Sequence, residues 1–214
     1  MNFHSYRPSE GHGLAYNPLN SIIAPRPIGW ISTRDTLGRN NLAPYSFFNA
    51  FHYTPPIIGF AGTDWKHTVQ NAAETKEFAW NLVTEELAEA MNITSASVDR
   101  GVDEFELANL TAMPSTLITA PRVAESRVSM ECRVIDVRQF HDMDGNTLQG
   151  WMVFGQVVAV HIDQRLIENG IYQTARARPI LRCGGLHDYA KLTEDWIVKI
   201  QRAAGDHNTA THGS

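Results

Sequence analysis

Cysteine is scarce in this sequence, which has only Cys132 and Cys183 among its 214 residues. The two match no metal-binding or redox spacing, so we expect a pair of reduced thiols in a cytoplasmic protein. The nine histidines include no His-Glu-x-x-His or comparable pair, and no metal site is predicted. No run approaches the ~18 apolar residues of a membrane helix. The polar first 16 residues contain no apolar core of a signal peptide, so we expect no membrane association.

Excess positive charge is also missing. Eighteen basic residues stand against 23 acidic ones, for a net charge of −5, and no cluster of Lys and Arg occurs. Because nucleic-acid surfaces need a basic stripe, no nucleic-acid partner is expected. The spacing reveals no Ser-His-Asp, Cys-His or paired-carboxylate arrangement, so no catalytic side chain is predicted. The absence of a Gly-x-Gly-x-x-Gly motif argues against a Rossmann unit.

The length favours one domain, because all-β barrels of this size are commonly single units. We expect an N-terminal arm over residues 1–20, a folded domain over 21–205 and a disordered polar tail over 206–214. Two long strands joined by a turn at 142–146, after shorter strands, predict a mainly β protein built as an antiparallel barrel with flanking helices. The expected strands are 28–33, 41–51, 54–62, 78–83, 128–134 and 151–162. The expected helices are 68–76, capped by Thr68, then 84–91, a short one at 104–110, and an amphipathic one at 194–204.

The segment 40–51, Asn-Asn-Leu-Ala-Pro-Tyr-Ser-Phe-Phe-Asn-Ala-Phe, is too aromatic for a loop and too polar for an ordinary core strand. Pro44 removes one donor from the strand ladder, and Asn41, Ser46 and Asn49 can donate and accept hydrogen bonds. Flat apolar rings mixed with short donors suit a planar ring system with polar edges. Phe47, Phe48 and Phe51 are expected in the core.

Together with Arg26-Pro27-Ile28-Gly29-Trp30-Ile31-Ser32-Thr33 and Lys66-His67-Thr68, this segment resembles the flavin reductase-like family of FMN-binding split barrels. The resemblance runs from about Arg26 to Tyr189, where Gly184-Gly185-x-x-x-Tyr189 approximates the family's ending. It implies a split barrel of Greek-key type that binds FMN, or FAD, and uses NAD(P)H as co-substrate. Gly101–Ala108 and Ala120–Ser126 also fit the family pattern, and we interpret them as markers of the fold at the rim of the site.

The resemblance assigns cofactor contacts to three segments. Lys66 and Thr68 would meet the phosphate, since a helix start and a lysine both attract anions. His67 replaces the family's commoner aspartate and leaves this anion site intact. Trp30 either offers a face to the flavin or packs in the core. The full set of expected cofactor contacts is Trp30, Ser32, Thr33, Asn41, Ala43, Pro44, Tyr45, Ser46, Asn49, Lys66 and Thr68.

Three functions fit this resemblance. The first is an NAD(P)H-dependent flavin oxidoreductase, in which bound flavin carries the chemistry, with an oxygenase as one expected electron acceptor. The second is an electron carrier with tightly held FMN, and the third is a flavin-binding or storage module. His187 lies either near a bound nicotinamide or in an exposed loop. We expect a homodimer with flavin at the subunit boundary, because a small barrel has little interior to hold both a flavin and its own core.

Overall fold

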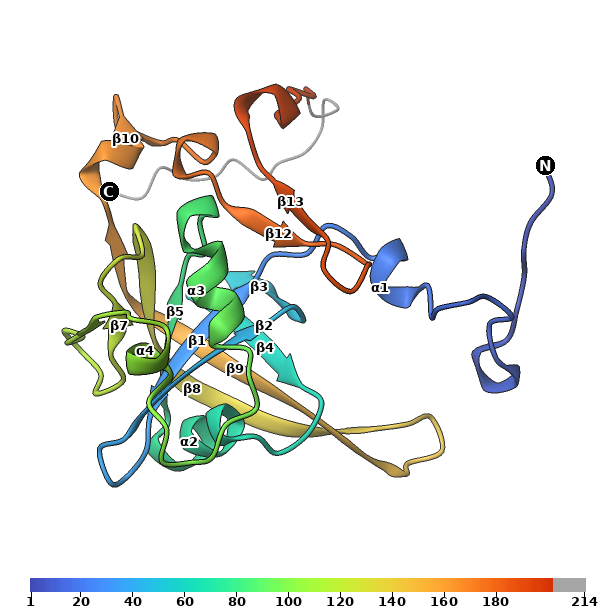
Figure 1. Cartoon of the computed structure of the whole chain (residues 1–214), viewed down its shortest axis with the longest axis horizontal. Helices are drawn as coiled ribbons and strands as arrows, with labels where there is room; N and C mark the ends of the chain where they lie inside the picture. Colours follow the sequence, from blue (N-terminus) through green and yellow to red (C-terminus); the bar gives the residue numbers. More distant parts are fainter. Residues whose placement is uncertain (202–214) are drawn as a thin grey trace.

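The computed structural model describes residues 1–201, and its centre is a seven-stranded antiparallel sheet coiled into a barrel (Figure 1). The strand order is β2-β1-β5-β8-β9-β4-β3, so β2 and β3 form the two edges. This confirms the expected mainly β, antiparallel architecture. The strands are β1 (Gly29–Arg34), β2 (Asn40–Tyr45), β3 (Phe48–Tyr53), β4 (Pro56–Gly62), β5 (Glu77–Asn81), β8 (Val128–His141) and β9 (Thr147–Ile162).

Apolar side chains pack on both faces of β1, which is why nearly every residue of that strand is buried. Inside the barrel, Phe60 and Phe78 meet at right angles with ring centroids 5.4 Å apart, and both are fully buried. On the other face, Trp30 and Phe105 belong to a second cluster beneath helices α3 (Ala88–Ile93) and α4 (Glu104–Leu107). Two cores therefore hold β1 and its neighbours rigidly, as a binding site on β2 requires.

The remaining elements are short. Helix α2 (His67–Thr75) follows β4 and covers one end of the barrel (Figure 1). Small two-stranded sheets pair β6 (Ala112–Met113) with β7 (Arg122–Val123), β10 (Ile167–Glu168) with β11 (Ile171–Tyr172), and β12 (Ile180–Arg182) with β13 (Tyr189–Lys191). Single 3₁₀ turns lie at η1 (Pro8–Glu10), η2 (Glu85–Leu87), η3 (Gln164–Leu166), η4 (Ala175–Ala177) and η5 (Glu194–Trp196).

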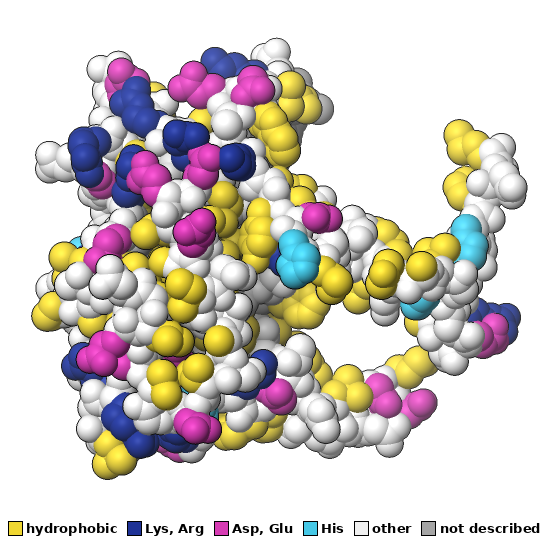
Figure 2. All heavy atoms as spheres, viewed as in Figure 1, with side chains coloured by type: hydrophobic (Ala, Val, Ile, Leu, Met, Phe, Trp, Pro, Cys, Tyr) yellow, Lys and Arg dark blue, Asp and Glu magenta, His cyan; other side chains and the backbone are white. Residues whose placement is uncertain are grey.

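The N-terminal arm projects away from the barrel, and Figure 2 shows hydrophobic side chains along it. It carries the short helix α1 (Leu19–Ile22), and Tyr16 and Ile22 are largely exposed. The part of the chain around β10 to β13 instead shows Lys and Arg mixed with Asp and Glu (Figure 2), including a pair between Arg176 and Glu168 at 2.7 Å. Among residues 1–201, no helix is long and apolar enough to cross a membrane.

One expected strand, 41–51, is wrong in its extent: it is two strands broken at Ser46-Phe47. β2 pairs with β1 and β3 pairs with β4, so the chain must cross between the two edges of the sheet. Arg26 holds the crossing, since its guanidinium donates to the Ser46 carbonyl at 3.2 Å and stands 5.9 Å from the centre of the Phe47 ring. Phe48 packs against the core, but Phe47 and Phe51 are exposed, contrary to expectation.

The expected amphipathic helix over 194–204 is also wrong for its described part, where only the turn η5 forms. Trp196, Ile197 and Ile200 are 54%, 48% and 86% exposed, so none of them is buried in a core. A short amphipathic helix gains most of its stability from such packing, so the pattern alone does not produce one. The rest of that helix and the expected tail over 206–214 lie outside the described residues.

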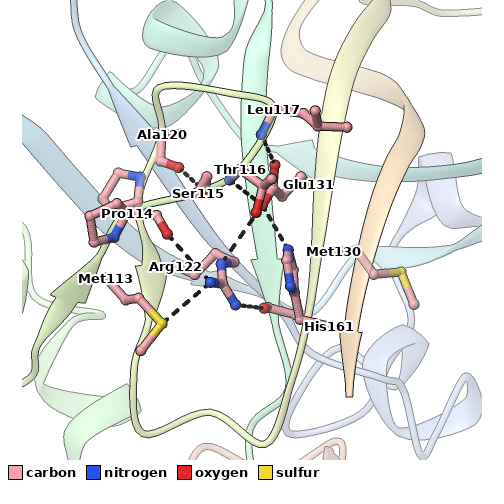
Figure 3. A network of polar contacts seen from close by, with 12 residues as sticks. Met113, Pro114, Ser115, Thr116, Leu117, Ala120, Arg122, Met130, Glu131 and His161 are labelled. Atoms are coloured by element: carbon pink, nitrogen blue, oxygen red, sulfur yellow. Dashed lines mark hydrogen bonds and ion pairs between the residues drawn. The ribbon is translucent and has the colours of Figure 1, made fainter. Parts of the chain in front are cut away.

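A fully buried carboxylate, Glu131 of β8, ties the barrel to the loop that precedes β7 (Figure 3). It accepts hydrogen bonds from the backbone amides of Thr116 and Leu117 at 2.7 and 2.6 Å, and contacts His161 Nε2 at 2.7 Å. Arg122 Nε lies 3.8 Å away. Burial pushes the pKa of Glu131 upward, but these hydrogen bonds outweigh burial and hold the pKa below its ordinary value.

Candidate cofactor site

A cavity of about 340 Å³ opens between β2, the start of α2 and the loop that follows α3. β2 contributes one wall with Asn41, Ala43, Pro44 and Tyr45. The segment Asp64–Thr68 forms the second wall, the loop Thr94–Val98 the third, and Glu104 of α4 completes the lining. Its size falls at the lower end of the range of small-molecule sites.

Hydrogen bonds fix the wall made by β2. The Asn41 amide donates to the Thr68 hydroxyl at 2.8 Å, which joins the strand to α2. The Glu104 carboxylate accepts from the backbone amide of Leu42 at 3.0 Å, which joins the strand to α4. Burial raises the pKa of Glu104 above its ordinary value. Both contacts hold the edge strand in place, so the wall is formed before any ligand arrives.

Tyr45 presents the least satisfied group in this wall. Its side chain is buried, and its hydroxyl makes no well-formed hydrogen bond among the described residues, with the Thr68 hydroxyl as its polar neighbour. Burial raises the pKa of Tyr45 to about 12, so the hydroxyl keeps its proton at neutral pH. An unpaired buried hydroxyl costs about 1–3 kcal/mol unless a ligand satisfies it. Tyr45 is a residue of the cavity wall, so a hydroxyl without a well-formed hydrogen bond favours a polar ligand there.

The start of α2 supplies the features of an anion site. Lys66 is the N-cap residue, and its exposed side chain makes no ion pair among the residues that the structure describes. The first amides of a helix lack internal partners and lie at the positive end of its dipole. The expectation that Thr68 caps this helix is wrong: Thr68 lies inside the first turn, buried, with its hydroxyl engaged by Asn41.

Six of the expected contacts line this cavity together, namely Asn41, Ala43, Pro44, Tyr45, Lys66 and Thr68. The other five do not line it. Trp30 is fully buried and donates to the Thr94 hydroxyl at 2.9 Å, so of its two alternatives the structure shows core packing. Ser32 donates to the Pro121 carbonyl, and the Thr33 hydroxyl accepts from Asn71 at 3.1 Å. Ser46 lies at the break after β2, and the exposed Asn49 bonds the Ala50 amide. Flavin contacts for all eleven residues stay predictions.

Sequence reasoning missed part of the lining. Ser95 and Ser97 are exposed on the loop after α3 and line the same cavity, where the Ser95 hydroxyl donates to the Asn92 carbonyl at 2.6 Å and can still accept. Glu104 was expected to shape the rim, yet it lines the interior and is buried. Trp65 was not singled out at all. The run Thr-Ser-Ala-Ser at 94–97 is the one signal that reasoning from the residues could have used, as a cluster of donors after a helix.

The lining fits the phosphate and polar arm of FMN. Lys66 and the helix start match a phosphate, the serine hydroxyls and the Tyr45 hydroxyl match ribityl oxygens, and Ala43-Pro44 lets the backbone approach a flat ring. No group of three His, Cys, Asp or Glu side chains able to hold a metal occurs within residues 1–201.

Known proteins resemble this chain in sequence and in fold. The sequence model of the flavin reductase like domain matches residues 22–181. An uncharacterized protein of Aquifex aeolicus is 34% identical over 191 residues, which cover 86% of this chain and 93% of that protein. The structure of nitrilotriacetate monooxygenase component B from Bacillus cereus has 31% identity and a TM-score of 0.85, covering 92% of this chain and 100% of that one. A split-barrel protein of Shewanella frigidimarina has 25% identity and a TM-score of 0.76, covering 86% and 90%. These similarities confirm the split-barrel fold.

Proposed function

Because the chain belongs to the flavin reductase-like family, we propose that it binds FMN and uses it to oxidise NAD(P)H. The observation that carries the proposal is the cavity that Tyr45 and the start of α2 line together with Lys66, which makes no ion pair within residues 1–201. Bound FMN would supply the redox chemistry, accepting a hydride from the nicotinamide and releasing its electrons to an acceptor.

The residues of the chain would bind and orient. Lys66 and the first amides of α2 would hold the phosphate by charge and by N–H donation. Tyr45, protonated at neutral pH, would donate a hydrogen bond to an oxygen of the cofactor. Asn41 and Glu104 would act indirectly, by holding β2 at a fixed distance from α2 and α4. No side chain is assigned a proton-transfer role.

The electron acceptor follows by analogy. The Bacillus cereus neighbour is named as component B of a monooxygenase. We therefore propose that this chain supplies electrons to a partner oxygenase, in the same way that one component of a two-component enzyme serves the other. The analogy is with a relative at 31% identity, and it concerns only the transfer of electrons to the oxygenase.

Steady-state oxidation of NADH and NADPH, with and without added free FMN, tests the proposal. Turnover that rises with free FMN supports a reductase that releases its flavin. A bound flavin that is reduced without exchanging identifies an electron carrier instead. A bound flavin that neither NADH nor NADPH reduces contradicts the proposed activity and leaves a binding module.

A further inference from the structure

Trp65 stands at the rim of the cofactor cavity with 45% of its surface exposed. Its ring centroid lies 4.4 Å from that of Trp151, at an interplanar angle of 65°. Trp151 thus packs against part of the indole, while the 45% exposure of Trp65 leaves another part open beside the cavity. A large, flat apolar face held beside a polar cavity is suited to stacking with a planar ring.

The position of Trp65 in the chain limits which ligand ring can stack on it. It directly precedes Lys66, the N-cap of α2, and consecutive Cα atoms are about 3.8 Å apart. A phosphate held at Lys66 and the start of α2 would therefore lie next to the indole. The group that dinucleotides carry beyond a phosphate is adenosine, whereas FMN ends at its phosphate.

We propose that Trp65 forms an adenine subsite, in which the base of a dinucleotide stacks on the exposed part of the indole. The inference rests on the proposed function, because it places a phosphate at Lys66. Asp64, exposed and lining the same cavity, offers a carboxylate that accepts hydrogen bonds from ribose hydroxyls or from the adenine amino group. The adenine could belong to FAD or to NAD(P)H, and both present the same ring to the indole.

Binding measurements on the full-length chain, stripped of copurified flavin, test this subsite. Isothermal titration with AMP, FAD, FMN and riboflavin compares the wild type with Trp65→Ala and Trp65→Phe. Trp196→Ala is the matched control, since Trp196 is also about half exposed, at 54%, and does not line the cavity. A fifth titration, NADH into the FMN-loaded protein, separates the two sources of adenine. Thermal unfolding of each variant verifies that it is folded.

Stacking of a base on an aromatic side chain contributes enough binding free energy that Trp65→Ala should lower the affinity for AMP about tenfold. FMN and riboflavin should change less than twofold, and Trp65→Phe should retain most of the affinity for AMP. A tenfold loss for FAD supports the subsite with the flavin dinucleotide as its source. A loss for NADH with FAD unchanged supports it with the nicotinamide dinucleotide as its source.

Two results would overturn the inference. Equal weakening of FMN and FAD would mean that Trp65 contacts the flavin portion, and unchanged affinity for all adenine ligands would mean that the indole only packs. Failure of the adenine subsite can be distinguished from failure of the proposed flavin binding. A wild type that binds AMP through Trp65 but binds no flavin keeps the subsite and refutes the flavoprotein.

Discussion

Tyr45 combines deep burial with a hydroxyl that makes no well-formed hydrogen bond among residues 1–201. Elsewhere in β2, the Asn41 side-chain amide and the Leu42 backbone amide are both engaged in hydrogen bonds. We interpret the weakly satisfied Tyr45 hydroxyl as a group available to a ligand. The free energy that this hydroxyl costs in the free protein should return as binding energy in the complex.

Replacing Tyr45 by Phe tests this directly. Because the lost hydroxyl makes no well-formed hydrogen bond in the free protein, the free energy of unfolding without flavin should stay level or rise. The affinity for FMN should fall about three- to tenfold, as expected for one hydrogen bond of about 1 kcal/mol. Chemical denaturation and flavin titration measure the two quantities, and Tyr189→Phe, an exposed tyrosine outside the cavity, is the control. A clear loss of stability with unchanged FMN affinity would assign the hydroxyl a structural role.

A second prediction for a single residue concerns Lys66. Its replacement by Ala should weaken FMN about ten- to a hundredfold, because a hydrogen bond to a charged group contributes about 1.5–3 kcal/mol. Riboflavin, which lacks the phosphate, should bind unchanged. Lys199→Ala controls for the loss of a surface charge, since Lys199 is exposed and does not line the cavity. Equal losses for FMN and riboflavin would show that Lys66 acts through folding.

At the scale of helices and strands, the sequence predicts the elements that hydrophobic periodicity and turn residues determine. The alternation in 128–134 and the turn at 142–146 predict the β8–β9 hairpin, and the Thr-Pro-Pro start predicts β4. The errors have a common cause, because they depend on partners that are remote in the sequence. The break at Ser46 is held by Arg26, and a helix after Thr193 would need packing against remote residues, which the local pattern does not encode.

The candidate site divides in the same way, into residues predicted by local sequence and residues brought in by remote contacts. Six expected contacts come from two short motifs and meet at one cavity, since β2 and the start of α2 are each a local element. Ser95, Ser97 and Glu104 reach that cavity only because α3 and α4 fold back over β2. Spacing along the chain carries no information on that return, so the run at 94–97 marks a cluster of donors without placing it at this cavity.

Glu131 gives a prediction for the β8–β9 hairpin and the loop it anchors. Since its pKa is lower in the folded protein, its ionised form stabilises the fold above the ordinary value of 4.5, and this contribution is lost as the pH falls below that value. Glu131→Gln should lower the free energy of unfolding at pH 7 by about 1–3 kcal/mol. The variant should also lose less stability than the wild type between neutral and acidic pH.

Denaturant unfolding over pH 3–7, a range of about four units around the ordinary Glu value, measures both effects. Asp136→Asn provides the control, because Asp136 pairs with Arg138 on the surface, where ion pairs contribute about 0–1 kcal/mol. Parallel pH profiles for Glu131→Gln and the wild type would show that the acid loss of stability arises elsewhere.

For the whole molecule, the exposed apolar surface bears on assembly. Phe51 and Tyr53 of the edge strand β3 are 53% and 83% exposed, and the arm exposes Tyr16 and Ile22. Exposed apolar strand edges and arms of this kind promote aggregation of a monomer, and another chain commonly covers them. They support the proposal of a homodimer with flavin at the subunit boundary.

Sedimentation of the flavin-loaded protein tests the dimer. We predict a species of about 48 kDa, twice the 23.9 kDa of one chain, and an apparent stability that rises with protein concentration. Tyr53→Asp, which places a charge on the exposed edge strand, should shift the equilibrium toward the monomer. A species of one chain that still binds and reduces FMN at low concentration would show that the dimer is not required.

The central claim is that this split barrel binds FMN in the cavity between β2 and α2. Titration of the flavin-free protein with FMN, followed by flavin fluorescence, tests it most directly. The account predicts saturable quenching with a dissociation constant of about 1 μM or lower, corresponding to about −8 kcal/mol, and loss of that affinity in Lys66→Ala. Fluorescence that stays unquenched up to saturating FMN would contradict it.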